Sequence, residues 1–326
     1  MRRFAFIAVA CAAVYFLAIP FAFRGSPYIL SVLTNAAIAA VISSGVWLTF
    51  AIGRINIAQG AFCMIGGYAT AVLTTRYGVP FWICLPLSGL AAAAFGALIG
   101  WPLLRLKGVY FSMISLSLTE AVRLAFLNGG KLTNEASGIV GIPGPGAVSI
   151  AGIELIPAFD GSSPLPFYYL SALLLAGTLL ALWRIMNCRI GWVFRSLRLN
   201  EELASSMGVN VAAYRVLAFS LSSFIGGVGG SFYAVYQQNI YPASYTVTDS
   251  MNYMLYCFLG GLDYVLGALV GAFTLVLSFE LLHALQTYQT LIYAGIMILA
   301  MLLLPNGIIS FPMFHGGRAA SRGGGR

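Results

Sequence analysis

Repeated apolar runs of membrane length constrain this chain more than any other feature. A run of roughly 20 apolar residues is long enough to cross the hydrocarbon core of a bilayer as a helix. Such runs predict spanning helices at residues 4–23, 28–52, 57–75, 81–104, 108–127, 167–186, 216–237, 265–285 and 290–304, with a shorter spanning or re-entrant segment at 250–259. We therefore expect an all-α integral membrane protein with about ten transmembrane or partly spanning helices.

The composition excludes a soluble protein and leaves little material for catalysis. Only 8% of the residues are charged, whereas a soluble domain carries roughly 25%. The chain has nine acidic residues and two histidines, and it contains no P-loop, G-x-S-x-G or H-E-x-x-H motif. The five cysteines form no C-x-x-C pair. We therefore expect no enzyme, no metal site and no cofactor bound by this chain.

The distribution of basic residues predicts the orientation. If both ends face the cytoplasm, the inner side holds 13 of the 17 lysines and arginines, and the outer side holds Arg24, Arg76 and Lys131. An excess of Lys and Arg marks cytoplasmic loops, so we expect cytoplasmic N- and C-termini. The basic residues lie singly or in pairs at the ends of apolar runs. They are not gathered with aromatics on one face, so nucleic-acid binding is not indicated.

The chain divides into a membrane domain at 1–305 and a Gly/Arg-rich tail at 306–326, which we expect to be cytoplasmic and disordered. The apolar run after Met1 lacks a convincing cleavage site, so we expect an uncleaved helix rather than a signal peptide. Two long polar stretches interrupt the membrane domain. Residues 128–166 form a Gly/Pro-rich loop predicted to face outward, and residues 187–215 form a charged loop predicted to face the cytoplasm.

The loop at 187–215 contains an amphipathic pattern. Leu199, Leu203 and Met207 follow one another at i, i+4 and i+8 and share one helical face, and Gly208 predicts the end of that helix. The opposite face carries Arg198, Glu201, Glu202 and Ser205. The helix is either an interfacial connector or a docking helix that offers an apolar ridge to a partner's groove. A transporter driven by a separate ATPase needs a docking helix.

Two hydrophobic segments, one in each half of the chain, are interrupted by polar residues and glycines. Such interruptions indicate either tight helix packing or a broken helix beside a translocation path. Paired interruptions in two halves point to the central pathway of a transporter. The candidate path residues are Asn56, Gln59, Gly60, Gly66 and Gly67 in the first segment and Asn252, Gly260 and Gly261 in the second.

Two i, i+3 pairs of ionisable residues fall within predicted helices. For Glu120 and Arg123 we favour a structural ion pair over a substrate contact. Glu280 and His283 form the second pair. A histidine can titrate near neutral pH, so this pair is the basis of an alternative hypothesis, a proton-coupled secondary transporter.

Four blocks of sequence then suggest a family. They are residues 53–68, residues 103–110 with Thr119, Glu120 and Arg123, residues 137–143, and residues 191–210 continuing to 226–230. On these blocks the chain, from about residue 36 to 305, resembles the permease subunits of ABC importers of the branched-chain amino acid type. The most specific match is Glu202-x-Ala204-x-x-x-Gly208, which is similar to the family's E-x-A-x-x-x-G core. Length and the extra first helix favour the longer of the two permease paralogues.

The resemblance implies a set of partners and a role. The partners are a second permease subunit in a heterodimer, ATP-binding subunits that use the ATP, and an extracytoplasmic substrate-binding protein, assembled in the bacterial inner membrane. The chain itself would be a multi-pass permease that forms part of the translocation path for branched-chain or other small amino acids. The implied ATPase-coupling residues are Leu199, Glu201, Glu202, Leu203, Ala204, Met207 and Gly208.

The chain departs from the family pattern at three positions. Gln59 stands where a histidine is usual, Arg54 where an uncharged residue is often found, and Asp263 where a glycine is common. These changes lie near the predicted path and concern the substrate more than the architecture. Relatives carry urea, short amides or aromatic acids, which are therefore alternative substrates.

Overall fold

The computed structural model describes residues 26–106, 108–146, 148–150, 153–156, 159, 164–304 and 307–310. The predicted first helix at 4–23 and most of the predicted tail lie outside the described residues. Within them, five helices are long and apolar enough to cross a membrane: α3 (Pro27–Phe50), α5 (Phe81–Leu103), α6 (Val109–Leu127), α7 (Leu165–Asn187) and α10 (Val211–Gln237). The chain is therefore an all-α membrane protein, as predicted.

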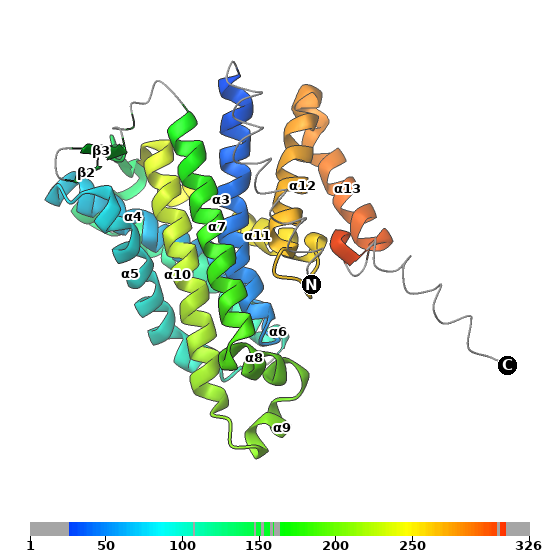
Figure 1. The fold of residues 1–326 in the computed structure, drawn as a ribbon. Helices are drawn as coiled ribbons and strands as arrows, with labels where there is room; N and C mark the ends of the chain where they lie inside the picture. The colour runs from blue at the N-terminus through cyan, green and yellow to red at the C-terminus, as the bar shows by residue number, and fades with distance from the viewer. Residues whose placement is uncertain are drawn as a thin grey trace.

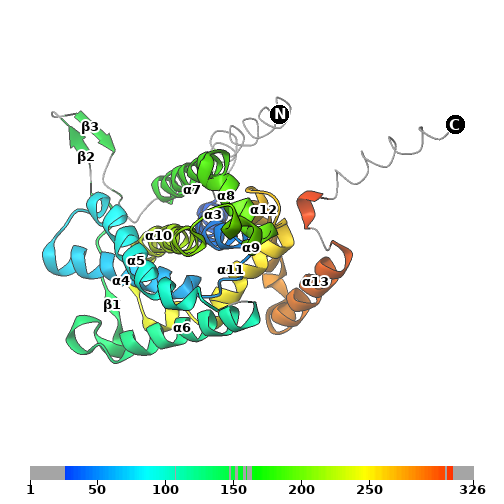
Figure 2. The same cartoon turned by 90° about the horizontal axis from the view of Figure 1, so that it is seen from below.

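Helices α3 and α10 form the centre of the bundle. Figure 2 shows them surrounded by α5, α7, α4 (Gln59–Tyr77), α11 (Val247–Gly260) and α12 (Gly267–Leu281). Most residues of α3 are buried, and many of them are small. Glycines on α10 allow a similarly close approach, because a Cβ built on Gly227 would lie 2.6 Å from the Cβ of Ala92 on α5. Small residues thus set the spacing of the core helices.

The first predicted interruption is a break between helices, and the second predicted segment is interrupted at residues 261–266, between α11 and α12. After α3 the chain turns at 51–53, follows a non-helical linker over residues 54–58, and enters α4 at Gln59. After α10, residues 238–246 include β4 (Asn239–Ile240) and a short 3-10 turn, η4 (Pro242–Ser244), before α11 begins. Helices α4 and α11 meet at their N-termini, where the Gly60 amide donates to Ser250 Oγ at 2.9 Å.

The C-terminal part differs from the prediction. The helix expected over 265–285 ends at Leu281, and a 3-10 segment, η5 (Leu282–Tyr288), leads into α13 (Gln289–Leu303). The backbone reverses at Gln286, which has φ 39°. Polar residues replace the continuous apolar pattern at this point, so the sequence around Gln286 no longer favours one long helix. A final turn, η6 (Ile308–Ser310), completes the described chain.

The polar loops lie at opposite ends of the bundle (Figure 1). At one end, the loop after α6 contains η2 (Gly130–Leu132), η3 (Glu135–Ser137) and β1 (Ile139–Val140), which pairs with β4; β2 (Val148–Ile150) pairs with β3 (Ile153–Ile156). The amides of Gly141 and Ile142 donate to the carbonyl of Gln238, both at 3.0 Å, which attaches this loop to the break before α11. At the other end lie α8 (Arg189–Leu199) and α9 (Glu201–Ser206).

Candidate functional site

The predicted amphipathic helix is two helices, so its prediction as one piece is wrong. Asn200 adopts an extended conformation between α8 and α9 (φ −159°, ψ 111°). Its Oδ1 accepts hydrogen bonds from the amides of Glu202 and Leu203, at 3.0 and 3.1 Å. Asparagine is a favoured N-cap, and here the cap restarts the helix. Gly208 ends α9 as predicted, with φ +84° just after the last turn.

The three apolar side chains are nevertheless all exposed. Leu199 is 86% exposed, Leu203 is 64% exposed and Met207 is 80% exposed. We call these three residues the apolar ridge. Ala204 faces the other way and is buried, whereas Glu202 is exposed and forms no ion pair in the described part of the chain. An exposed apolar surface on a polar loop is typical of an interaction site.

Beneath the ridge, one carboxylate holds two arginines. Glu201 Oε1 lies 3.0 Å from Nη2 of Arg54, which precedes α4, and Glu201 also forms an ion pair with Arg215 of α10. Both arginines are buried. Burial, followed by the neighbouring positive charge of Arg215, lowers the pKa of Arg54, and Glu201 opposes that shift. We call Arg54, Glu201 and Arg215 the Glu201 cluster.

The family resemblance implies a coupling role for Glu201 but does not identify its two partners. Arg54, which departs from the family pattern, has Glu201 as its ion-pair partner. The available signal was the position of two basic residues, Arg54 after the end of α3 and Arg215 near the start of α10, close to a loop with few acidic residues. This signal does not identify the acidic residue that the two arginines share.

A second ion pair joins α8 to the turn after α11. Arg198 Nη2 lies 2.8 Å from Asp263 Oδ1, and both side chains are exposed. The backbone of Arg198 also packs beside Gly53, where an added Cβ would lie 3.5 Å from the Arg198 Cα. The end of α8 therefore touches the turn after α3 and the turn after α11. Asp263, the third departure from the family pattern, also has a partner.

Hydroxyl groups satisfy the backbone of linker 54–58. Ser115 Oγ accepts from the Ile57 amide and Thr119 Oγ1 donates to the Ile57 carbonyl, both at 3.1 Å. Ser112 Oγ donates to the carbonyl of Ile55, also at 3.1 Å. Non-helical backbone is tolerated at membrane depth only when it is buried in protein or lines a cavity. Helix α6 thus supplies the hydroxyls that make the first break possible.

Gln59 and Asn56, two of the predicted path residues, are fully buried at this break. Gln59 Nε2 donates to the carbonyls of Ile42 and Ser222, both at 3.2 Å. Ile42 lies eight residues before the end of α3 at Phe50, which corresponds to about 12 Å along the helix at 1.5 Å per residue. Asn56 Oδ1 accepts from the Ala58 amide at 2.9 Å, and Asn56 Nδ2 has no hydrogen-bond partner among the described residues. The break therefore places polar side chains deep in the bundle.

The glycine candidates serve close packing or turns. A Cβ added to Gly60 would clash with Ser250, and one added to Gly66 would clash with Gly227. A Cβ added to Gly67 would clash with Ile240, and one added to Gly260 with the backbone of Gly267. Gly261 ends α11 with φ +115°. Asn252 is half-buried on α11. These contacts favour the packing interpretation for the glycines, and the course of the translocation path stays a prediction.

One of the two predicted ion pairs is present. Arg123 Nε and Nη2 donate to the two carboxylate oxygens of Glu120, at 2.9 and 2.6 Å. In the described part of the chain, no ion pair or hydrogen bond joins Glu280 to His283. The second prediction is therefore wrong. Its physical reason is that α12 ends at Leu281, so the two residues do not share an α-helical turn.

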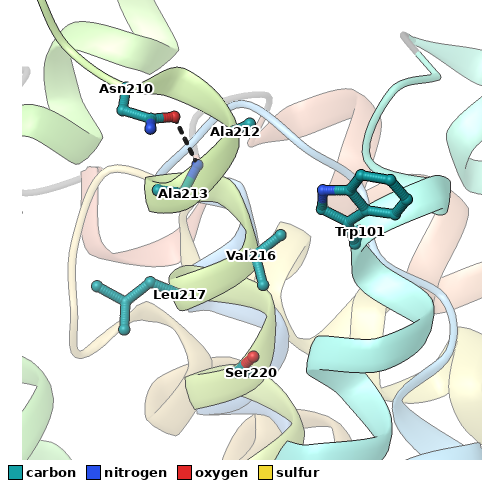
Figure 3. Close-up of a pocket in the computed structure, with 7 residues that line it drawn as sticks. All are labelled: Trp101, Asn210, Ala212, Ala213, Val216, Leu217 and Ser220. Atoms are coloured by element: carbon teal, nitrogen blue, oxygen red, sulfur yellow. Dashed lines mark hydrogen bonds between the residues drawn. The ribbon is translucent and has the colours of Figure 1, made fainter.

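A pocket of about 530 Å³ lies between α5 and α10, at the end of the bundle that carries α8 and α9 (Figure 3). Its lining residues are Trp101, Asn210, Ala212, Ala213, Val216, Leu217 and Ser220. Asn210 Oδ1 accepts from the Ala213 amide at 3.1 Å and so caps α10. None of these seven side chains, all in the described part of the chain, is titratable. Among the described residues, no three His, Cys, Asp or Glu side chains gather where they could hold a metal ion.

Sequence comparisons with known proteins place the chain in a family. A family model described as "branched-chain amino acid transport system / permease component" matches residues 28–304. The chain is 30% identical to the high-affinity branched-chain amino acid transport system permease protein LivM of Escherichia coli K12, covering 90% of this chain and 72% of that protein. It is 32% identical to LivM of Salmonella typhimurium, covering 79% of this chain and 64% of that protein.

More distant relatives carry other names. The autoinducer 2 import system permease protein LsrC of Salmonella typhi is 25% identical over 92% of this chain and 84% of its own length. No solved structure matches the chain. Because the family model covers most of the sequence, the chain belongs to the family of branched-chain amino acid transport system permease components.

Proposed function

We propose that this chain is a permease subunit of an ABC importer for branched-chain amino acids in the bacterial inner membrane. The observation that carries the proposal is the apolar ridge, which is exposed at one end of the bundle on a segment that ion pairs join to linker 54–58, to α10 and to the turn after α11. Family membership and the two LivM relatives support the substrate. The ridge then faces the cytoplasm, together with both chain termini, and docks an ATP-binding subunit.

The remaining partners follow from the same proposal. The ATP-binding subunits hold and hydrolyse ATP, and this chain contributes no catalysis. A second, different permease completes the membrane part. Relatives of this chain in Methanocaldococcus jannaschii include both a LivH and a LivM permease, which supports such a pairing. A substrate-binding protein delivers the solute at the opposite end, where β1 pairs with β4.

Within the membrane, linker 54–58 and the N-termini of α4 and α11 border the path in this proposal. Their meeting point is lined by hydroxyl and amide groups supplied by Asn56, Gln59, Thr119 and Ser250. A path for a small polar solute needs such groups, because a wholly apolar bundle would offer the solute nothing in exchange for its hydration shell.

The docking part of the proposal can be tested by co-purification. The chain is expressed with its ATP-binding subunits, second permease and binding protein, and is purified by a tag on this chain. Leu203→Asp and Met207→Asp place a charge on the apolar ridge and should abolish co-purification of the ATP-binding subunits. Leu132→Asp is the matched control, because Leu132 is 63% exposed in the loop at the opposite end. Retention of the ATP-binding subunits by both ridge variants would refute the docking assignment.

The substrate is tested separately in vesicles that contain the complete complex. Uptake of radiolabelled leucine should be inhibited by unlabelled isoleucine and valine. Urea, a short amide and an aromatic acid are the competitors that represent the alternative substrates. Stronger inhibition by one of these three than by isoleucine would replace the branched-chain assignment.

A further inference from the structure

The Glu201 cluster connects two parts of the molecule with different roles. Glu201 is the first residue of α9, next to the apolar ridge. Arg54 is the first residue of linker 54–58, which ends where α4 begins. Their charged groups are 3.0 Å apart, although the residues are separated by 147 positions in the sequence. The pair is thus a direct contact between the docking segment and the first helix break.

Arg54 depends on this contact for its position. Its side chain is 4% exposed, and Glu201 is its only ion-pair partner among the described residues. Arg215 has a second anchor, because its Nη1 donates to the carbonyl of Leu104 at 3.3 Å. Loss of the Glu201 carboxylate would leave two buried guanidinium groups facing each other without a counter-charge, and an uncompensated buried charge is strongly unfavourable. Arg54 would then have to move.

The linker can transmit such a movement. It spans no more than about 18 Å between Arg54 and Gln59, at 3.3–3.6 Å per residue. The backbone polar groups of Ile55 and Ile57 bond to individual hydroxyls of α6 rather than to a continuous helix or sheet ladder. Hydroxyls can rotate to follow a shifted backbone. Asn56 and Gln59, which the linker carries, lie at the meeting point of α4 and α11.

We propose that the Glu201–Arg54 ion pair is the mechanical link through which α9 moves the N-terminus of α4. The inference rests on the proposed function, because it requires that an ATP-binding subunit displaces α9. In this arrangement Arg215 keeps Glu201 against α10, and Arg54 passes the displacement to the linker. Glu201 and Arg54 are positioning residues, since neither belongs to the apolar ridge that meets the ATP-binding subunit.

The test measures coupling rather than activity alone. Complete complexes are reconstituted in vesicles, and amino acid uptake and ATP hydrolysis are measured on the same sample. Glu201→Gln and Arg54→Gln should retain the ATP-binding subunits and hydrolyse ATP, while the amount transported per ATP falls about tenfold, within the range of measured coupling effects. Arg54→Lys keeps the charge and should recover most of the wild-type ratio. Glu135→Gln and Arg184→Gln are matched controls at exposed positions.

The outcomes separate the two proposals. If the wild-type complex shows no ATP-driven uptake, the proposed function fails and the link fails with it. If the wild-type complex is coupled and Arg54→Gln transports as much per ATP as wild type, the link alone is overturned. Should Glu201→Gln fail to assemble, Arg54→Gln decides the question, because it leaves α9 unchanged. A fall in the ratio for Arg54→Gln with recovery in Arg54→Lys supports the link.

Discussion

The close contact between α5 and α10 makes Gly227 a stringent test of the structure. Replacement by alanine adds a Cβ that would lie 2.6 Å from the Ala92 Cβ, 2.9 Å from the Ser88 carbonyl oxygen and 3.1 Å from the Gly89 Cα. Carbon atoms in favourable contact are about 3.5–4.0 Å apart. None of the three neighbours is a flexible side-chain end, so the two helices would have to separate by about 1 Å.

The expected magnitude follows from two opposing effects. Overpacking a well-packed core costs about 1–3 kcal/mol, and the rigid neighbours place Gly227→Ala near the upper end. Alanine gains about 1 kcal/mol of helix propensity over glycine. The net destabilisation is therefore about 2 kcal/mol, which lowers the melting temperature of a chain of 326 residues by roughly 3 °C, at an unfolding entropy of about 2.1 cal/mol/K per residue.

The assay is thermal unfolding of the purified chain in detergent, with Gly177→Ala as the control. Gly177 lies within α7 and has no atom within 4 Å of an added Cβ. Only the propensity gain remains there, so Gly177→Ala should match or slightly exceed the wild-type melting temperature. The packing argument is refuted if Gly227→Ala is as stable as Gly177→Ala.

Three further predictions concern the site. Gly208→Trp forces a bulky residue to φ +84°, at a cost of about 1–2 kcal/mol, and should weaken co-purification of the ATP-binding subunits. Co-purification of the same amount of ATP-binding subunits as with wild type would argue against the need for Gly208 at the end of α9. Ser250→Ala removes the acceptor of the buried Gly60 amide, which should cost about 1–3 kcal/mol in thermal unfolding, whereas an unchanged melting temperature would mean that the amide has another acceptor. His283→Asn should leave the pH profile of uptake unchanged, because His283 is exposed and unpaired with Glu280; a shifted profile would restore the proton-relay hypothesis.

Features set by local sequence were predictable. The apolar runs fixed the long helices α3, α5, α6, α7 and α10 to within a few residues, because length and hydropathy are properties of one segment. The Glu120–Arg123 pair and the stop at Gly208 follow from spacing within one helix. A capping box also marks the start of α11, since Thr246 and Asp249 bond each other's backbone amides. That signal places the helix start at Val247, three residues before the predicted segment.

Features that depend on distant residues were not predictable from one sequence. Nothing local indicates that Glu201 binds Arg54, or that Arg198 binds Asp263 across 65 positions. The break at Asn200 was missed for a different reason. The apolar residues on either side keep a helical spacing, and that spacing concealed an asparagine that caps a new helix.

The most direct test of the central claim is leucine uptake into vesicles that contain either this chain alone or the complete complex with its ATP-binding subunits, second permease and binding protein. Uptake is measured with and without ATP, and in the presence of an uncoupler that dissipates the proton gradient. The proposed function predicts uptake only by the complete complex, dependent on ATP and unaffected by the uncoupler. Uptake by this chain alone that continues without ATP and collapses with the uncoupler would contradict it.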